Sequence, residues 1–122
     1  MAQCLWQAPP SRIANAKLTQ FQHKIETENG ASFASYDALY TWSINYPELF
    51  WAAVWQFCGV RSSTPHHSII RAGTSFSDTA WFEGAKLNYA ENLLRRRDDK
   101  TAIVSLLENG QRRCLSYAQL YK

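Results

Sequence analysis

The last third of the chain constrains its fold most strongly. Thr101–Leu107 predicts a strand, Asn109–Gly110 predicts a hairpin turn, and Gln111–Leu115 predicts the returning strand. A first strand that is apolar on both faces is typical of the interior of a larger sheet. Its apolar residues are Ala102, Val104 and Leu106 on one face, and Ile103 and Leu107 on the other.

The residues after the hairpin begin a helix. Ser116 and Gln119 have the spacing of a capping box, but only six residues follow Ser116. Isolated helices shorter than about 12 residues are marginal in water, and a hairpin needs a third strand or a packed helix to be stable. We therefore expect this segment to belong to a longer protein whose other strands and helices cover it.

The N-terminal part of the chain predicts an amphipathic helix. Pro9–Ser11 predicts an irregular arm before the helix, and Asn29–Gly30 supplies residues that tolerate a left-handed backbone and end it. Between these points, apolar residues recur along one helical stripe. The stripe consists of Ala14, Leu18, Phe21 and Ile25.

Two further helices are predicted before residue 60. Ser35 is suited to cap the first, with Asp37 in its first turn. Asn45 is suited to cap the second, Pro47 fits its first turn, and Gly59 fits the position that ends it. This second helix is apolar over a wide arc, which predicts cover on more than one side. The arc contains Leu49, Phe50, Trp51, Val54, Trp55 and Phe57.

The middle of the chain has weaker signals. Residues 61–80 are rich in Ser, Thr and Pro and lack strong periodicity, so we expect a surface connection with one short strand at Ser68–Ile70. Asn88 and Glu91 resemble a capping box that opens a helix. We expect this helix to run to Arg97, with arginines at its C-terminal end.

Cysteine usage and charge narrow the possible functions. Cys4, Cys58 and Cys114 are odd in number and widely spaced, which argues against a disulfide framework or a structural zinc site. Residues 1–6 show no signal peptide, so we expect a cytoplasmic location. The apolar run Leu49–Trp55 is too short to span a membrane, and a net charge of +3 is too small for a typical nucleic-acid binder. We expect neither a membrane nor a nucleic-acid partner.

Two polar runs suggest binding chemistry but have simpler interpretations. His66–His67 with Cys58 resembles a metal site, yet adjacent histidines on a strand face opposite ways, so we favour a surface pair. Arg95–Arg97, followed by Asp98–Lys100, resembles a phosphate or nucleic-acid contact. We favour a solvated helix end and a charged linker.

Other reactive or aromatic side chains are also expected to be structural. Cys58 and Cys114 have no conspicuous base nearby in sequence, so we expect buried structural thiols rather than nucleophiles. Glu91 is explained by helix capping and Glu83 by a turn surface, so we expect neither to act as a general acid or base. The tryptophans are expected to pack within the protein rather than stack on bases. They are Trp42, Trp51, Trp55 and Trp81.

The glycines do not form a phosphate-binding loop. No G-x-x-x-x-G-K run exists, and Thr74–Ser75 beside Gly73 lacks a second glycine that would let the backbone curl around a phosphate. We therefore assign no catalytic, cofactor-binding or metal-binding residue to this sequence. We also expect no cofactor to be bound by these 122 residues alone.

The segment Trp81–Leu94 resembles the W-F-x-G-x-x-L-N signature of the acyl- and acetoacetyl-CoA synthetases of the adenylate-forming superfamily. Its extension Asn88–Leu93 is similar to the acetoacetyl-CoA branch. Residues 61–80 are the least similar to that branch. Further stretches resemble it in the same order along nearly the whole chain, namely Leu5–Trp6, Tyr36–Ser43, Phe50–Trp55 and Leu115–Leu120.

The resemblance implies an α+β fragment. Residues 1–97, with a core at 35–94, would be the helical N-terminal region of an acyl-CoA synthetase. Residues 98–122 would be the first β-hairpin and the helix start of an α/β adenylation (AMP-binding) domain. The remainder of that adenylation domain would be the partner of this fragment in cis.

The resemblance also implies an activity for the whole protein. It would be a cytoplasmic ligase of fatty acid and lipid metabolism that uses ATP, Mg²⁺ and CoA. Acetoacetate would form an acyl-adenylate with release of diphosphate, and CoA would then displace AMP to give acetoacetyl-CoA. The phosphate loop, acidic hinge and catalytic lysine that the family uses do not occur in this sequence.

Three functions stay open from the sequence. Scaffolding within an acid–thiol ligase, which we favour, predicts a loosely packed or aggregating isolated chain. A stand-alone protein-interaction module predicts cooperative thermal unfolding instead. A weak nucleic-acid binder, using the arginines and aromatic residues, predicts single-strand binding with a steep salt dependence.

Overall fold

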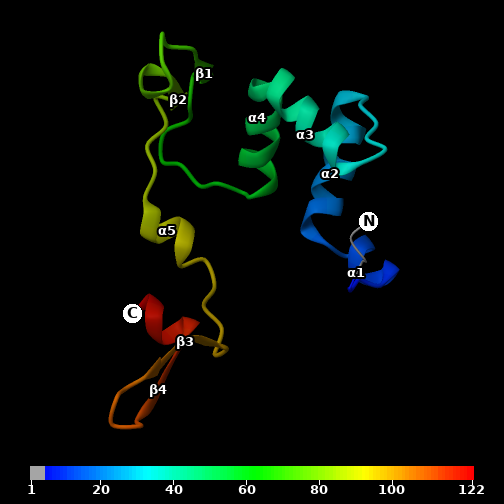
Figure 1. The fold of residues 1–122 in the computed structure, drawn as a ribbon. Helices are drawn as coiled ribbons and strands as arrows, with labels where there is room; N and C mark the ends of the chain where they lie inside the picture. The colour runs from blue at the N-terminus through cyan, green and yellow to red at the C-terminus, as the bar shows by residue number, and fades with distance from the viewer. Residues whose placement is uncertain (1–4) are drawn as a thin grey trace. The chain divides into compact units, whose positions relative to one another are not determined.

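The computed structural model describes residues 5–122, so Cys4 and the start of the N-terminal stretch interpreted above lie outside the described residues. The chain divides into two compact units. The first contains the residues up to Gly59 together with Ser68–Trp81, and the second contains Val60–His67 together with Phe82–Lys122. Figure 1 shows the order of the helices and strands along the chain.

Helices dominate the first unit, and short strands and helices make up the second. The first unit holds α1 (Pro10–Ala14), α2 (Lys17–Asn29), α3 (Tyr36–Asn45), α4 (Pro47–Phe57), β1 (Ser68–Arg71) and the 3₁₀ turn η1 (Phe76–Asp78). The strand β2 (Ala80–Glu83) contains the boundary between the units. The second unit holds α5 (Tyr89–Leu93), β3 (Thr101–Leu106), β4 (Arg112–Ser116) and α6 (Tyr117–Tyr121).

The strands form two separate two-stranded sheets. β1 lies beside β2, and β3 lies beside β4. Helices followed by small antiparallel hairpins confirm the predicted α+β class. The predicted domain boundary between residues 97 and 98 stays a prediction, since both sides of it lie in the second compact unit.

The helix predicted near the N-terminus is confirmed as α2, and the irregular arm before it is present but ends at Pro9 rather than at Ser11. Gly30 ends α2 in a left-handed conformation, with φ of 64°. Pro10 begins the separate helix α1, to which Ala14 also belongs. A proline suits the first turn because its φ is already helical and its missing N–H has no partner to lose there.

The caps of α3 and α4 are partly as predicted. The Ser35 hydroxyl accepts a hydrogen bond from the Ala38 N–H at 3.2 Å, which confirms this cap. The prediction that Asn45 caps the next helix is wrong, because Asn45 is the last residue of α3 and Tyr46 is the cap of α4. Pro47 disfavours a helical backbone in the residue before it, so the break between the helices falls on Tyr46.

A small apolar core holds α2, α3 and α4 together. Phe21 packs against Phe50 and Phe57 at ring-centroid distances of 5.8 and 5.2 Å, and Phe33 packs against Trp42 at 5.6 Å. The buried residues of this core are Phe21, Ile25, Phe33, Leu39 and Ala53. Ala53 is the only buried residue of α4, so the described part of the chain does not provide the cover predicted for its wide apolar arc.

The predicted hairpin is confirmed in the second unit. β3 pairs antiparallel with β4, with Val104 opposite Cys114 and Leu106 opposite Arg112, and an irregularity lies between Thr101 and Ile103. Gly110 has φ of 79°, as the predicted turn requires. The apolar residues of β3 are not covered by other described residues, since Val104 is 48% exposed and Leu106 is 75% exposed.

The helix predicted from Asn88 to Arg97 is shorter than expected. The Asn88 side chain accepts a hydrogen bond from the Glu91 N–H at 3.1 Å, which confirms the cap. However, α5 ends at Leu93, and the three arginines lie beyond it. The Asn92 carbonyl accepts from the Arg95 side chain at 2.7 Å, which satisfies a carbonyl of the last turn without a further helical residue.

Candidate functional site

The signature segment occupies an unusual stretch of backbone in the second unit. Phe82 has φ of 48° and Gly84 has φ of 88°, so two of three successive residues adopt left-handed backbone. A bulky residue with positive φ is a true outlier. The space beside Gly84 is filled by the His67 ring, whose Cδ2 lies 2.6 Å from where a Cβ atom would stand. Glycine is therefore favoured at position 84 both by the left-handed backbone and by the close approach of the His67 ring.

Backbone hydrogen bonds tie residues 61–67 to the signature segment. The His67 N–H donates to the Glu83 carbonyl at 3.0 Å, and the Ser63 N–H donates to the Lys86 carbonyl at 2.9 Å. The Lys86 N–H donates in return to the Thr64 carbonyl at 3.2 Å. This ladder explains why a glycine is required where the two segments approach each other.

Asn92 extends this ladder from the helix α5. Its side-chain oxygen accepts from the Arg61 N–H at 2.8 Å, and its side-chain nitrogen donates to the Arg61 carbonyl at 2.8 Å. The Asn92 side chain therefore makes the pair of hydrogen bonds that the backbone of a residue on a neighbouring strand would make. The two asparagines of the signature segment differ in role. Asn88 caps α5, whereas Asn92 makes hydrogen bonds to the backbone of Arg61.

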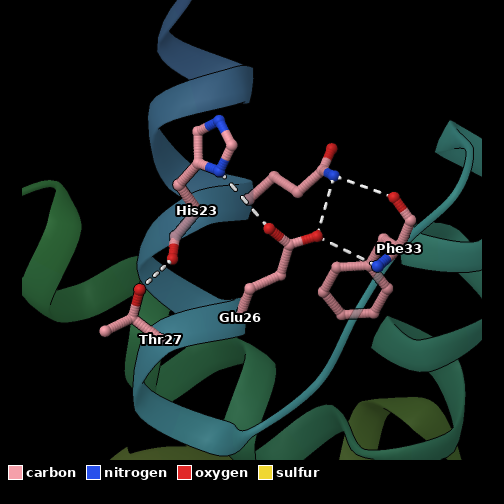
Figure 2. Close-up of polar contacts among 5 residues, drawn as sticks. His23, Glu26, Thr27 and Phe33 are labelled. Carbon is pink, nitrogen blue, oxygen red and sulfur yellow. Dashed lines mark hydrogen bonds and ion pairs between the residues drawn. The ribbon is translucent and has the colours of Figure 1, made fainter.

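A similar arrangement holds a loop against α2 in the first unit (Figure 2). The Glu26 carboxylate accepts from the Phe33 N–H at 2.9 Å and from the Gln22 side chain at 3.0 Å. The Gln22 side chain also donates to the Phe33 carbonyl at 3.0 Å, and His23 Nδ1 lies 3.3 Å from Glu26. These contacts fix the backbone of Phe33, whose ring lies in the core.

The ionised form of Glu26 is the one that this arrangement stabilises. Hydrogen bonds from the Gln22 side chain and the Phe33 N–H hold the pKa of Glu26 below its ordinary value. A carboxyl whose pKa is lower in the folded protein stabilises the fold above its ordinary pKa near 4.5. That contribution is lost as the pH falls through the lower folded value.

We expect Glu26→Gln to reduce the loss of folding stability at acidic pH. The free energy of unfolding of the unaltered chain should fall between pH 5 and pH 3, as judged by helix content in urea at each pH. The variant should show a smaller fall, because its side chain does not take up a proton. Glu28→Gln is the matched control, since Glu28 lies on the same helix and pairs with Lys24 rather than with Phe33. Superimposable profiles for Glu26→Gln and the unaltered chain would contradict this role.

The arginine run is placed differently from its prediction. Arg96 lies over the ring of Tyr117 at 4.9 Å and pairs with Asp98 at 3.1 Å, and Arg97 lies over the ring of Tyr121 at 3.7 Å. The three arginines are exposed in the segment after α5, as predicted for a solvated charged linker, but they do not lie on the end of the helix itself. These guanidinium groups make cation–π contacts with one face of each aromatic ring of α6.

The residues that resembled a metal site each have other neighbours in the structure. The His66 ring packs against Phe82 at 5.3 Å, and His67 lies against Gly84, whereas Cys58 ends α4 in the other unit. Among residues 5–122, no group of three His, Cys, Asp or Glu side chains is arranged to hold a metal ion. The same residues include no helix long and apolar enough to cross a membrane.

Both described thiols differ from their prediction. Cys58 and Cys114 were expected to be buried, but both are exposed. Cys58 follows the last turn of α4, and Cys114 lies on β4 opposite Val104, a position that no other described element covers. Apolar neighbours in the sequence indicated burial, but burial requires a second layer of structure.

The structure also shows the positions of two glutamates and two tryptophans considered in the sequence. The N–H of Glu91 donates to Asn88, as expected, whereas Glu83 ends strand β2 instead of lying on a turn surface. Trp51 and Trp81 pack edge to face at 5.5 Å within the first unit. Each of them is nevertheless more than a third exposed.

The segment beside Gly73 does not fit a nucleotide phosphate. The Thr74 and Ser75 hydroxyls donate to the Asp78 carboxylate at 2.9 and 2.8 Å, which hold the pKa of Asp78 below its ordinary value, with Ser75 contributing most. The backbone of Asp78 closes the space beside Gly73, since a Cβ atom there would lie 2.4 Å from it. A carboxylate at this point would repel a phosphate.

An open apolar groove runs between α2 and α4. Its volume is about 250 Å³, and it is lined by Lys17, Leu18, Phe21, Val54, Phe57 and Cys58. It contains no acid–base pair. The groove therefore suits an apolar side chain rather than a reaction.

Three comparisons place the chain among known proteins. The family model described as "Acetyl-coenzyme A synthetase N-terminus" matches residues 36–93, from the start of α3 to the end of α5. The acetoacetyl-CoA synthetase of Danio rerio is 40% identical over 102 residues, which cover 81% of this chain and 15% of that protein. A malonamoyl-CoA synthetase of Penicillium aethiopicum is 33% identical over 125 residues, which cover 95% of this chain and 17% of that protein.

A solved structure agrees with these relatives. The acetoacetyl-CoA synthetase from Streptomyces lividans superimposes with a TM-score of 0.82 and 35% identity, covering 96% of this chain and 19% of that chain. The chain thus spans less than a fifth of the length of the relatives that it matches.

Proposed function

Because the chain corresponds to the N-terminal region of the acetoacetyl-CoA synthetase family, we propose that it is a scaffold region of an acetoacetate–CoA ligase. Its helices and hairpin would pack against the adenylation domain of the whole enzyme and complete the surface of that domain. The observation that supports this best is the exposure of apolar residues on both faces of β3, beside an ordered signature segment that contains no reacting group.

We propose that the whole enzyme joins a short acid with a carbonyl at its third carbon to CoA. Acetoacetyl and malonamoyl, the acyl groups named for two relatives, share that feature. Acetoacetate would attack the α-phosphate of ATP to form an acyl-adenylate and diphosphate, and the thiol of CoA would then displace AMP. The enzyme would act in lipid metabolism in the cytoplasm.

ATP, Mg²⁺ and CoA would be held by parts of the enzyme outside these residues. The loop at Gly73 is closed by Asp78, and its hydroxyls already donate to a carboxylate. Catalysis of phosphoryl and adenylyl transfer needs cationic groups and N–H donors aimed at the phosphates. The described residues do not fit that demand, so we assign them no step of the reaction.

The proposal that these residues take no part in the reaction is testable with the isolated chain. Acetoacetate-dependent exchange of radioactive diphosphate into ATP should not rise above the buffer background, because no group here can stabilise the adenylate-forming step. Exchange above background that disappears without acetoacetate would contradict a purely structural role.

A fluorescent single-stranded oligonucleotide should also fail to bind at low salt, because Arg96 and Arg97 are stacked on tyrosines.

A further inference from the structure

The connection between α5 and β3 is held at both of its ends. This connection, residues 95–100, contains three arginines followed by two aspartates and a lysine. The Arg95 side chain donates to the Asn92 carbonyl at 2.7 Å, so the connection begins with a contact to the last turn of α5. Its later residues contact α6, which follows the hairpin in the sequence. The stretch expected to be a charged linker therefore contacts a helix on either side of it.

The backbone of this connection supplies acceptors for the first turn of α6. The first N–H groups of a helix have no partner within the helix itself. The Tyr117 N–H donates to the Lys100 carbonyl at 3.0 Å. The Ala118 N–H donates to the Asp98 carbonyl, also at 3.0 Å. These two donors of α6 are satisfied only when the connection lies against the start of the helix.

Two arginine side chains of the connection make further contacts with α6. The Arg97 guanidinium lies 3.7 Å from the centroid of the Tyr121 ring. The Arg96 guanidinium lies 4.9 Å from the centroid of the Tyr117 ring, and it donates to the Asp98 carboxylate at 3.1 Å. The two tyrosines are four residues apart, so their rings lie on one face of α6. Neighbouring arginines thus contact successive turns of the same helix face.

We propose that residues 95–100 form an arginine strap, a rigid connection that fixes the end of the signature segment to the first helix after the hairpin. α5 and α6 lie on opposite sides of the domain boundary expected between residues 97 and 98, and the strap contacts both helices. The chain therefore has no hinge at this boundary. Arginine suits the role because its planar guanidinium stacks on an aromatic face while it donates hydrogen bonds in its plane. The inference rests on contacts within the second compact unit and does not depend on the proposed function.

The strap predicts slow trypsin cleavage at a site whose sequence favours rapid cleavage. The side chains of Arg95, Arg96 and Arg97 are exposed, and trypsin cleaves after arginine wherever it can draw the backbone into an extended form. The cleavage rate follows the population of the open form when opening and closing are fast relative to cleavage. Cleavage in the strap should therefore report how often the strap detaches from α6.

The test is the rate of trypsin cleavage after Arg95, Arg96 or Arg97 in the full 122-residue chain, followed by mass spectrometry. The double variant Tyr117→Leu with Tyr121→Leu removes both aromatic faces and leaves every trypsin site in place. We expect cleavage in the strap to accelerate by about fivefold or more, because the loss of two exposed cation–π contacts shifts a local equilibrium by that order. Leucine is a better helix former than tyrosine, so a lower helix propensity of α6 would not explain the acceleration.

Two further variants are the controls. Tyr117→Phe with Tyr121→Phe keeps both ring faces, so its cleavage rate should stay within about twofold of that of the unaltered chain. Tyr89→Leu removes a ring that is 79% exposed at the start of α5. This variant should leave cleavage in the strap unchanged, because surface changes away from a contact are close to neutral.

Equal cleavage rates in the strap for the leucine pair and the unaltered chain would overturn the proposal, as would a phenylalanine pair that is cut as fast as the leucine pair. A second measurement covers the case in which the leucine pair loosens the hairpin and accelerates cleavage at every site. In the unaltered chain, the NMR signals of the δ-methylene protons of Arg96 and Arg97 should lie upfield of those of Arg112 on β4, because an aromatic ring shields protons above its face. Signals at the same position as those of Arg112 would contradict the strap.

Discussion

Replacing Ile25 with alanine is expected to unfold the helices of the first unit. Ile25 is the only described large side chain that is fully buried, and it lies in a core of just five buried residues. Removing three carbon atoms from such a site costs about 2–5 kcal/mol, from the lost burial and the cavity left behind. A core this small has few other contacts to close the cavity, so we expect the upper part of that range.

The measurement is the circular dichroism at 222 nm, followed as urea is added. Ile44→Ala is the matched control, because it removes the same atoms from an α3 residue that is 56% exposed. The control should keep its helix signal, whereas Ile25→Ala should lose most of it before urea is added. Equal curves for the two variants would show that Ile25 does not hold α2 to its neighbours.

Replacing Gly84 with alanine is expected to break the ladder between residues 61–67 and the signature segment. Alanine at φ of 88° is strained, at a cost of about 1–2 kcal/mol. The new methyl group would also stand 2.6 Å from the His67 ring, which must move away. The two effects act on the same short ladder, so the loss of stability should exceed the backbone strain alone.

Gly110→Ala separates these two contributions. Gly110 has φ of 79°, but nothing lies within 4 Å of a Cβ atom placed there. Amide exchange at Ser63, His67 and Lys86 should accelerate in Gly84→Ala and stay unchanged in Gly110→Ala. Adding His67→Ala to Gly84→Ala should recover part of the protection, as a double-mutant cycle would detect. No recovery would mean that the imidazole does not fill this space.

Local signals in the sequence were sufficient to place three helix caps and the hairpin turn, although they assigned the cap of α4 wrongly to Asn45. Ser35, Asn88 and Ser116 each cap a helix through a backbone N–H three residues away, so their partners are fixed by chain geometry. Asn109–Gly110 forms the turn for the same reason. Such features depend on few residues and need no knowledge of the tertiary fold.

Features that depend on distant partners were not predictable from periodicity. β2 exists because its neighbour in the sheet is β1, and its last residue, Glu83, bonds to His67. Asn92 finds its partner Arg61 31 residues away. Asn92 lies one turn after the cap residue Asn88, but this spacing does not indicate a partner in residues 61–67.

How the candidate site is built depends on contacts that the sequence did not predict. The arginine run was assigned to a helix end, but Arg96 and Arg97 stack on Tyr117 and Tyr121. The exposure of Cys58 and Cys114 shows the same limitation. Charge and polarity in the sequence indicate candidate functional residues. The burial and the contacts of these residues depend on which elements of the fold pack against them.

The most direct test of the scaffold role is a chimera with a solved relative. In the Streptomyces lividans acetoacetyl-CoA synthetase, the region that superimposes on this chain would be replaced by these 122 residues. We predict that the chimera folds and forms acetoacetyl-CoA from acetoacetate, ATP and CoA, and that deletion of the region abolishes the formation of active enzyme. A deletion variant as active as the parent, or a folded chimera without acetoacetate-dependent activity, would contradict the account.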